Sequence, residues 1–195
     1  MKRAAIVLIP KIKKYKLNEV TNILNSDFPT DYPITDTKMP SLSLACSLSD
    51  DTEAHHQMNR KLLEAIFEQS PDINCKDSFE RTPLHHACNS GNLTAVCMLL
   101  EHSLYKPNPK LNGQKLEINA VTIGGETPLL KAAGQGNIDA VIELLQAGCD
   151  PTILDNRGID AAKHAENVHR KSNIHVIIRT FIGSDKSTND DKNTG

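Results

Sequence analysis

A pattern of helix-forming and turn residues occurs twice in this chain, 45 residues apart, and constrains the fold more than any other feature. The first copy, TPLHHACNSGNLTAVCMLL, runs from Thr82 to Leu100, and the second, TPLLKAAGQGNIDAVIELL, runs from Thr127 to Leu145. Thr, Pro, Leu, Ala, Gly, Asn, Ala, Val and the final Leu-Leu fall in one register without a gap. Such self-similarity is typical of repeat proteins, in which each unit packs only against its neighbours.

The shared residues are those that a pair of consecutive helices needs. Thr82 can cap the first helix, and Pro83 at the first helical position removes no hydrogen-bond donor that the helix uses. Gly91 can take the left-handed conformation that ends this helix. The apolar side chains predicted to pack the two helices are Leu84, Ala87, Val96, Leu99 and Leu100.

The pattern resembles the ankyrin repeat, and the resemblance covers nearly the whole chain. It implies an all-α fold, a short solenoid of helix–turn–helix repeats with β-turn or hairpin fingers, with about three full repeats plus N- and C-terminal capping helices. It also implies a non-catalytic adaptor or scaffold that binds a partner protein. The expected segments are a basic N-terminal arm at 1–16, a repeat domain at 17–182 (cap 17–35, repeats 36–76, 77–121 and 122–154, capping repeat 155–182) and a disordered polar tail at 183–195.

Two segments depart from the repeat pattern. In the first repeat Pro40 stands where Thr is expected, and the polar stretch Ser47–Met58 is predicted to be an enlarged loop before a second helix at Asn59–Glu68. Between the two best copies an insertion, 104–116, contains two prolines and an Asn-Gly pair that favours a tight turn. It is predicted to protrude as a loop or extended hairpin that carries Tyr105, Lys106, Lys110 and Lys115.

Composition limits the other possibilities. Apolar residues make up 38% of the chain and aromatic residues 4%, without Trp, so the core must consist of Leu, Ile, Val, Ala and Cys. The longest apolar run, Ala4–Ile9, is far shorter than the ~20 residues of a membrane-spanning helix and lacks the cleavage pattern of a signal peptide. Five cysteines without a CxxC pair indicate reduced thiols. We therefore expect a soluble protein of the cytoplasm, without a transmembrane segment.

The two ends of the chain have unusual charge and polarity. Residues 1–16 contain several Lys and Arg but no acidic residue. This arm could bind an acidic surface or anionic lipid, could be an organelle transit peptide, or could be a solvated lead-in whose apolar part packs on the domain edge, which is the simplest interpretation. Residues 183–195 have no apolar side chain able to pack, which predicts disorder.

No catalytic residue, metal site or cofactor is predicted. The pairs His55-His56 and His85-His86 are the densest histidines, but neither has a second ligand pair at zinc-like spacing. The resemblance implies that His85 is structural and ties one turn to the next. Cys88 occupies a position that is alanine in the second copy, and burial makes a thiol unreactive. The chain has no Gly-rich phosphate loop and no nucleophile elbow.

The surface is therefore the expected binding site. In ankyrin-like stacks, partners usually meet the concave side, which consists of the finger tips and the exposed face of the first helices. Phe79 beside Arg81 has the composition of an interface anchor, or alternatively folds back onto the stack. The candidate partner-binding residues, including those in the insertion, are Phe79, Arg81, His86, Asn89, Tyr105, Lys106, Lys110, Ile123, Glu126, Lys131, Arg157 and Ile159.

Two alternative functions remain open on the sequence alone. One is binding of a polyanion, either nucleic acid or an anionic membrane, through the basic arm and the Lys-bearing insertion, although a net charge of −2 gives no general polyanion-binding character. The other is a bacterial effector that acts on a host protein in the host-cell cytoplasm, since Lys outnumbers Arg 16 to 6 and small ankyrin-like effectors carry polar tails. The partner is a protein of unknown identity, and the chain is expected to be a monomer or a subunit of a larger assembly.

Overall fold

The computed structural model describes residues 12, 39–101, 113–168 and 173–190, and these ranges contain eight helices and no strand. The predicted cap at 17–35 and, apart from Ile12, the predicted basic arm lie outside the described residues. The helices are α3 (Ser41–Cys46), α4 (Glu53–Phe67), α5 (Pro83–Ser90), α6 (Leu93–Leu100), α7 (Pro128–Gln135), α8 (Ile138–Gln146), α9 (Ala161–Val168) and α10 (Ile174–Asp190).

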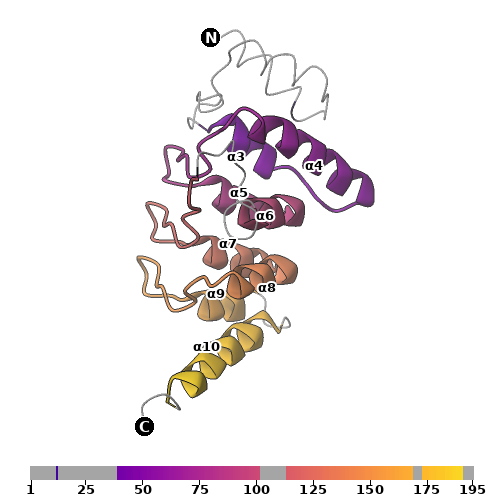
Figure 1. The fold of residues 1–195 in the computed structure, drawn as a ribbon. Coiled ribbons are helices and arrows are strands. Elements are labelled where there is room, and N and C mark those ends of the chain that lie inside the picture. Colours follow the sequence, from indigo (N-terminus) through magenta and orange to yellow (C-terminus); the bar gives the residue numbers. More distant parts are fainter. Residues whose placement is uncertain (1–11, 13–38, 102–112, 169–172, 191–195) are drawn as a thin grey trace.

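The helices form four pairs that stack in one direction (Figure 1). The first helices of the pairs, α3, α5, α7 and α9, pack on one another in order, and the second helices, α4, α6, α8 and α10, form a second row beside them. The loops that join one pair to the next project from one side of the stack. The sequence prediction of an all-α repeat solenoid is confirmed.

The helix ends follow the residues of the repeated pattern. The backbone N–H of Thr82 donates to Nδ1 of His85 at 3.1 Å, as part of a capping box at the start of α5. Thr127 caps α7, because its Oγ1 accepts from the backbone N–H three residues later at 3.2 Å. Gly91 and Gly136 end α5 and α7 with φ angles of 70° and 80°. Only glycine takes this left-handed conformation without a steric cost, so these residues fix the lengths of the first helices.

The core runs through the stack as columns of equivalent residues. Leu84 and Ala87 of α5 are fully buried, and small side chains at the Ala87 position let successive first helices approach closely. Cys46 and Cys88 are also fully buried, and for Cys88 this confirms the small core position that the repeat predicts. Ile177 of α10 is at the repeat position that corresponds to Leu144 of α8, but Ile177 is partly exposed whereas Leu144 is fully buried.

Helix α4 corrects one sequence prediction, since it begins at Glu53 and not near Asn59. Thr52 caps this helix by accepting from the backbone N–H of His55 at 3.1 Å. The prediction that all of Ser47–Met58 is an enlarged loop is therefore wrong for residues 53–58, which extend the helix at its N-terminus.

Asp50, in the short link before α4, joins this segment to the next repeat. Its carboxylate is buried and accepts from Nδ2 of Asn59 in α4 and from the backbone N–H of Thr94 in α6, each at 2.8 Å. A buried carboxylate needs such donors, because burial without them costs several kcal/mol. The link thus joins α4 to the start of α6, the second helix of the next pair.

Helix α10 also differs from the prediction, because its backbone continues beyond residue 182 to Asp190. Residues 183–190 were predicted to belong to a disordered tail, and residues 191–195 lie outside the described residues. The physical reason is that no proline follows Ile174, and extending an existing helix costs little once it has nucleated.

The end of the insertion is anchored to the preceding repeat. Oε1 of Gln114 accepts from the backbone N–H of Ile73 at 2.9 Å, and Nδ2 of Asn74 donates to the carbonyl of Lys115 at 2.8 Å. The chain has thus rejoined the stack by residue 114, before the predicted end of the insertion at 116. Residues 102–112 lie outside the described residues.

Candidate functional site

Three fingers with the same hydrogen-bond pattern project from the stack, at residues 77–81, 122–126 and 155–159. In each finger the first N–H donates to the fifth carbonyl and the fourth N–H donates to the first carbonyl, at 2.9–3.1 Å. The fourth residue of each finger has a φ angle near 70°: 60° for Glu80, 75° for Gly125 and 72° for Gly158. The fingers are therefore tight, repeated turns.

The first side chain of a finger holds its turn from within. Oδ1 of Asp77 accepts from the backbone N–H groups of Phe79 and Arg81 at 2.9 and 3.0 Å, and Asp155 does the same in the last finger. Burial would raise the pKa of Asp77, but the hydrogen bonds and charge of Arg81 outweigh it, so the pKa lies below its ordinary value. Asp155 has a lowered pKa for the same combination of reasons, with Arg157 as its partner. Both carboxylates are thus ionised at neutral pH.

Neighbouring fingers are bonded to each other through their backbones. The N–H of Ile123 donates to the carbonyl of Phe79 at 3.1 Å, and the N–H of Asn156 donates to the carbonyl of Gly124 at 3.0 Å. A Cβ on Gly125 would lie 2.9 Å from the backbone nitrogen of Asn156, so only glycine fits at this contact. The fingers consequently form one connected row and not three independent loops.

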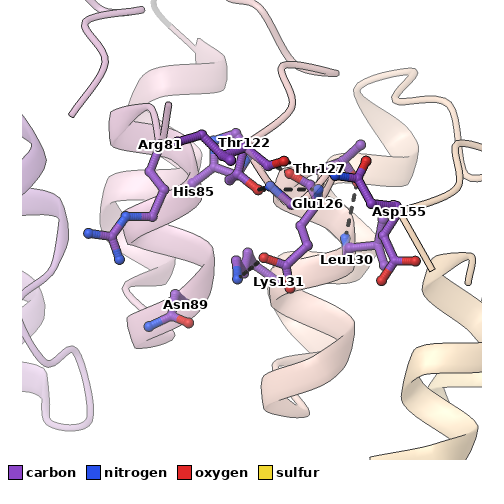
Figure 2. A network of polar contacts seen from close by, with 12 residues as sticks. Arg81, His85, Asn89, Thr122, Glu126, Thr127, Leu130, Lys131 and Asp155 are labelled. Atoms are coloured by element: carbon purple, nitrogen blue, oxygen red, sulfur yellow. Dashed lines mark hydrogen bonds and ion pairs between the residues drawn. The ribbon is translucent and has the colours of Figure 1, made fainter. Parts of the chain in front are cut away.

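His85 connects the second repeat to the third (Figure 2). Its Nδ1 accepts from the backbone N–H of Thr82, so the ring proton lies on Nε2, which donates to the carbonyl of Glu126 at 2.9 Å. Burial lowers the pKa of His85 to about 4, and the ring is neutral at pH 7. The predicted structural role of this histidine is confirmed.

His86 corrects another prediction, since it was expected on the exposed face and is only 6% exposed. Its Nε2 lies 3.1 Å from Oδ2 of Asp77, whose buried carboxylate requires hydrogen-bond donors. His86 therefore supports the finger from beneath and offers little surface to a partner.

Apolar side chains remain exposed on the fingers. Phe79 is 50% exposed and Ile123 is 63% exposed, and both were predicted as site residues. Val121 and Leu154, which are 44% and 55% exposed, were missed. Both residues directly precede a finger at equivalent places of the repeat, and no signal in the sequence separates them from buried residues.

The other predicted site residues lie on the same side of the stack. The guanidinium of Arg81 lies 4.8 Å from the centroid of the Phe79 ring. The ammonium of Lys131 on α7 pairs with Glu126 at 2.5 Å, and Arg157 pairs with Asp155 at 2.7 Å. Asn89 is exposed and accepts from Gln135 at 3.3 Å, whereas Ile159 is partly buried. Tyr105, Lys106 and Lys110 lie outside the described residues, so the structure does not test the insertion as a binding element.

The buried thiols are unreactive. Burial raises the pKa of Cys88 far above the neutral range and that of Cys149 to about 12. Cys97 is partly exposed and borders a hollow of about 180 Å³ between α6 and α8, where burial, followed by the charge of Glu143, raises its pKa. Among the described residues, no three or more His, Cys, Asp or Glu side chains could jointly hold a metal ion.

Comparison with known families decides the classification. The family model for ankyrin repeats (3 copies) matches residues 42–155, more than half of the chain. The chain belongs to the ankyrin repeat family. Ankyrin repeats are in general protein–protein interaction modules, and the family is typically non-catalytic. None of the helices in the described ranges has both the length and the apolar composition needed to cross a lipid bilayer.

Known ankyrin repeat proteins align with parts of the chain. Ankyrin repeat protein nuc-2 of Neurospora crassa is 30% identical over 135 residues, which cover 56% of this chain and 13% of nuc-2. The 26S proteasome non-ATPase regulatory subunit 10 of Dictyostelium discoideum is 34% identical over 93 residues, or 46% of this chain and 35% of that subunit. An ankyrin repeat-containing protein of Schizosaccharomyces pombe is 29% identical over 117 residues, or 58% of this chain and 45% of that protein. The chain therefore spans less than half the length of each of these relatives.

Proposed function

We propose that this protein is a non-catalytic adaptor or scaffold that binds a partner protein through its fingers and the exposed residues of its first helices. The observation that carries the proposal is a division of roles among the finger residues. Asp77 and Asp155 are buried and fully hydrogen-bonded, whereas Phe79 and Ile123 at the tips are half or more exposed. Large apolar side chains held in water on a bonded row of turns are typical of interfaces.

Rigid fingers favour binding because little conformational entropy is lost when a partner docks. Each finger is closed by two backbone hydrogen bonds, and the row is connected by the bonds from Ile123 to Phe79 and from Asn156 to Gly124. Side chains on such a frame are preorganised, which lowers the ordering cost of association. The same arrangement explains how residues far apart in the sequence can form one surface.

The proposed surface extends from the tips toward the first helices. It includes Asn89 on α5 and Lys131 on α7, which are exposed or half-buried on the finger side. Arg81, Glu126, Arg157 and Ile159 complete it, and His86 is no longer included. The described contacts thus support a surface made of three fingers and two helices.

Affinity capture tests the proposal. The wild-type protein is immobilised, and captured proteins are identified by mass spectrometry beside the variant Ile123→Asp. Ile123 is 63% exposed, so an aspartate there should leave folding intact while it removes apolar contact from the surface. We expect at least one protein to be captured by the wild type and lost from the variant.

The matched control is Ile138→Asp, which changes an isoleucine that is 41% exposed at the start of α8. It should retain the partner. Charge reversal at Arg81 or Arg157 is a poor test, because each arginine binds a buried carboxylate and its loss would damage the finger. Capture that survives Ile123→Asp but is lost with Ile138→Asp would place binding on the row of second helices, which includes α8, and refute the proposal.

A further inference from the structure

The charged residues of the three fingers are held in ion pairs. Within the finger residues and the adjoining Lys76 and Lys131, four cations pair with four carboxylates. The pairs are Lys76–Glu80 at 3.2 Å, Arg81–Asp77 at 2.7 Å, Lys131–Glu126 at 2.5 Å and Arg157–Asp155 at 2.7 Å. Each charged residue of the three fingers has an oppositely charged partner, and these four pairs together carry no net charge.

Exposed apolar side chains are concentrated on the same fingers and on the residues that directly precede them. Of the seven large apolar residues that are strongly exposed in the described part of the chain, four lie here: Phe79, Val121, Ile123 and Leu154. The remaining three, Ile138, Val168 and Val176, are on three separate helices. Exposed apolar residues that gather in this way mark interaction sites more often than scattered ones do.

The four residues lie on, or directly before, adjacent fingers. The backbone of Ile123 is bonded to that of Phe79 in the preceding finger, so these two residues are neighbours across the row. Val121 and Leu154 each directly precede the first residue of a finger, at equivalent places in adjoining fingers. Val121 and Ile123 flank Thr122, which is buried while both of its neighbours are exposed. We call these four residues the tip patch.

We propose that the tip patch binds an apolar, uncharged segment of a partner protein, and not an acidic segment or a polyanion. This inference rests on the proposed function and specifies the chemistry of the partner at that surface. An acidic partner would have to separate ion pairs that already satisfy the cations, whereas an apolar one gains from covering the tips without disturbing them. The guanidinium of Arg81 is stacked on one face of the Phe79 ring and holds the ring in place, and half of the Phe79 residue remains exposed.

Selection of random linear peptides displayed on phage, against the immobilised full chain, tests the inference. We expect the enriched peptides to be rich in apolar residues and without net charge. A synthetic copy of one such peptide should bind with an affinity that changes less than about twofold between ~50 mM and ~500 mM NaCl, since screening acts on charges. Ile123→Ser and Leu154→Ser should each weaken it about tenfold, as expected for loss of one buried aliphatic contact.

Ile138→Ser and Val176→Ser are the controls, because they remove apolar side chains that are 41% and 49% exposed on α8 and α10. These two variants should bind the peptide with unchanged affinity. Light scattering of the wild-type protein should show a monomer. Enrichment of acidic peptides, strong salt dependence, an absence of enrichment, or a dimer that Ile123→Ser dissociates would each overturn the inference. Peptides that bind near Asn89 and Lys131 but ignore Ile123→Ser and Leu154→Ser would overturn it while leaving the proposed function intact.

Discussion

At the scale of single residues, two adjacent histidines have different tasks. His85 joins two repeats, because one ring nitrogen accepts from Thr82 and the other donates to the carbonyl of Glu126. His86 stays within its own repeat and supports the carboxylate of Asp77. The third repeat has Leu130 at the position of His85, so it lacks this side-chain link to the closing repeat. The junction between the second and third repeats thus contains a hydrogen bond from a neutral imidazole to a carbonyl of the next repeat.

This dependence predicts that the protein loses stability in mild acid. The pKa of His85 falls from 6.5 to about 4 on folding, so the unfolded chain binds the proton first as the pH drops. The contribution of His85 is full above pH 6.5 and is lost as the pH falls toward 4, with a total of about 3 kcal/mol. His86 and His164, whose pKa values are lowered mainly by burial, act in the same direction. Urea unfolding at pH 7.5, 6 and 5 measures this loss.

His85→Leu is the control, since leucine occupies the equivalent position of the third repeat. The variant should be about 1–2 kcal/mol less stable at pH 7.5, because it loses the hydrogen bond to the carbonyl of Glu126. Its free energy of unfolding should then decline less steeply with acid than that of the wild type. Equal slopes for the two proteins would show that His85 is not the group responsible.

Glu80 offers a stabilising substitution. Its φ angle is 60°, whereas the equivalent residues in the other two fingers are glycines. A non-glycine residue in this conformation costs on the order of 1 kcal/mol, and the exposed pair with Lys76 offsets little of that cost. Glu80→Gly should therefore raise the free energy of unfolding by about 1 kcal/mol. The converse change, Gly125→Glu, should destabilise the protein. An unchanged midpoint of urea unfolding for Glu80→Gly would show that the backbone at Glu80 is not strained.

At the scale of the elements, α4 shows where local sequence signals stop being sufficient. Thr and Pro predict the starts of α5 and α7 and Gly predicts their ends, because these signals act within one helix turn. Helix α4 has a local cap, Thr52, but the link before it is held by Asp50, whose partners include Thr94 in the next repeat. The burial of His86 likewise depends on the carboxylate of Asp77, nine positions earlier. Contacts of this kind are not encoded in helix propensity or in the repeat pattern.

A proline substitution distinguishes a helix from a loop at the start of α4. Gln57 is exposed, and its side chain donates to Glu53 one turn earlier, at 3.2 Å. Gln57→Pro should lower the free energy of unfolding by about 3 kcal/mol, because it removes a backbone donor inside the helix. Gln57→Ala is the matched control and should have almost no effect. Thermal melting followed by circular dichroism gives both values, and a tolerated proline would support the loop that the sequence predicted.

The candidate site was only partly predictable for a similar reason. The repeat register places Phe79 and Ile123 on fingers, and both are exposed in the structure. Val121 and Leu154 precede the fingers in the register, and their exposure became clear only from the arrangement of adjacent turns. Arg81 and Arg157 looked like cations available to a partner, yet each is bound to an aspartate of its own finger. Register thus predicts position, while charge pairing depends on the folded finger.

At the scale of the whole molecule, stability comes from the interfaces between repeats. Helix α7 packs on α5 on one side and on α9 on the other, and Ala132 and Leu144 are fully buried between such neighbours. A repeat that loses one neighbour exposes this apolar surface to water. Cooperative unfolding should therefore require the closing repeat.

Truncation after Cys149 tests this requirement. Removal of residues 150–195 deletes α9 and α10, and the shortened chain should lose its cooperative urea transition or unfold at 25 °C. Truncation after Asp190 is the control, because it leaves both helices complete, and it should melt like the full chain. A sharp, unchanged transition in the shorter chain would contradict interdependence of the repeats.

The most direct test of protein binding through the fingers is hydrogen exchange of the full chain, alone and bound to the protein recovered by affinity capture. We predict slower exchange in the bound state at residues 121–126 and 154–159, with no change in α6 and α8 of the row of second helices. Slower exchange confined to α6 and α8, with the fingers unchanged, would contradict the proposed binding surface.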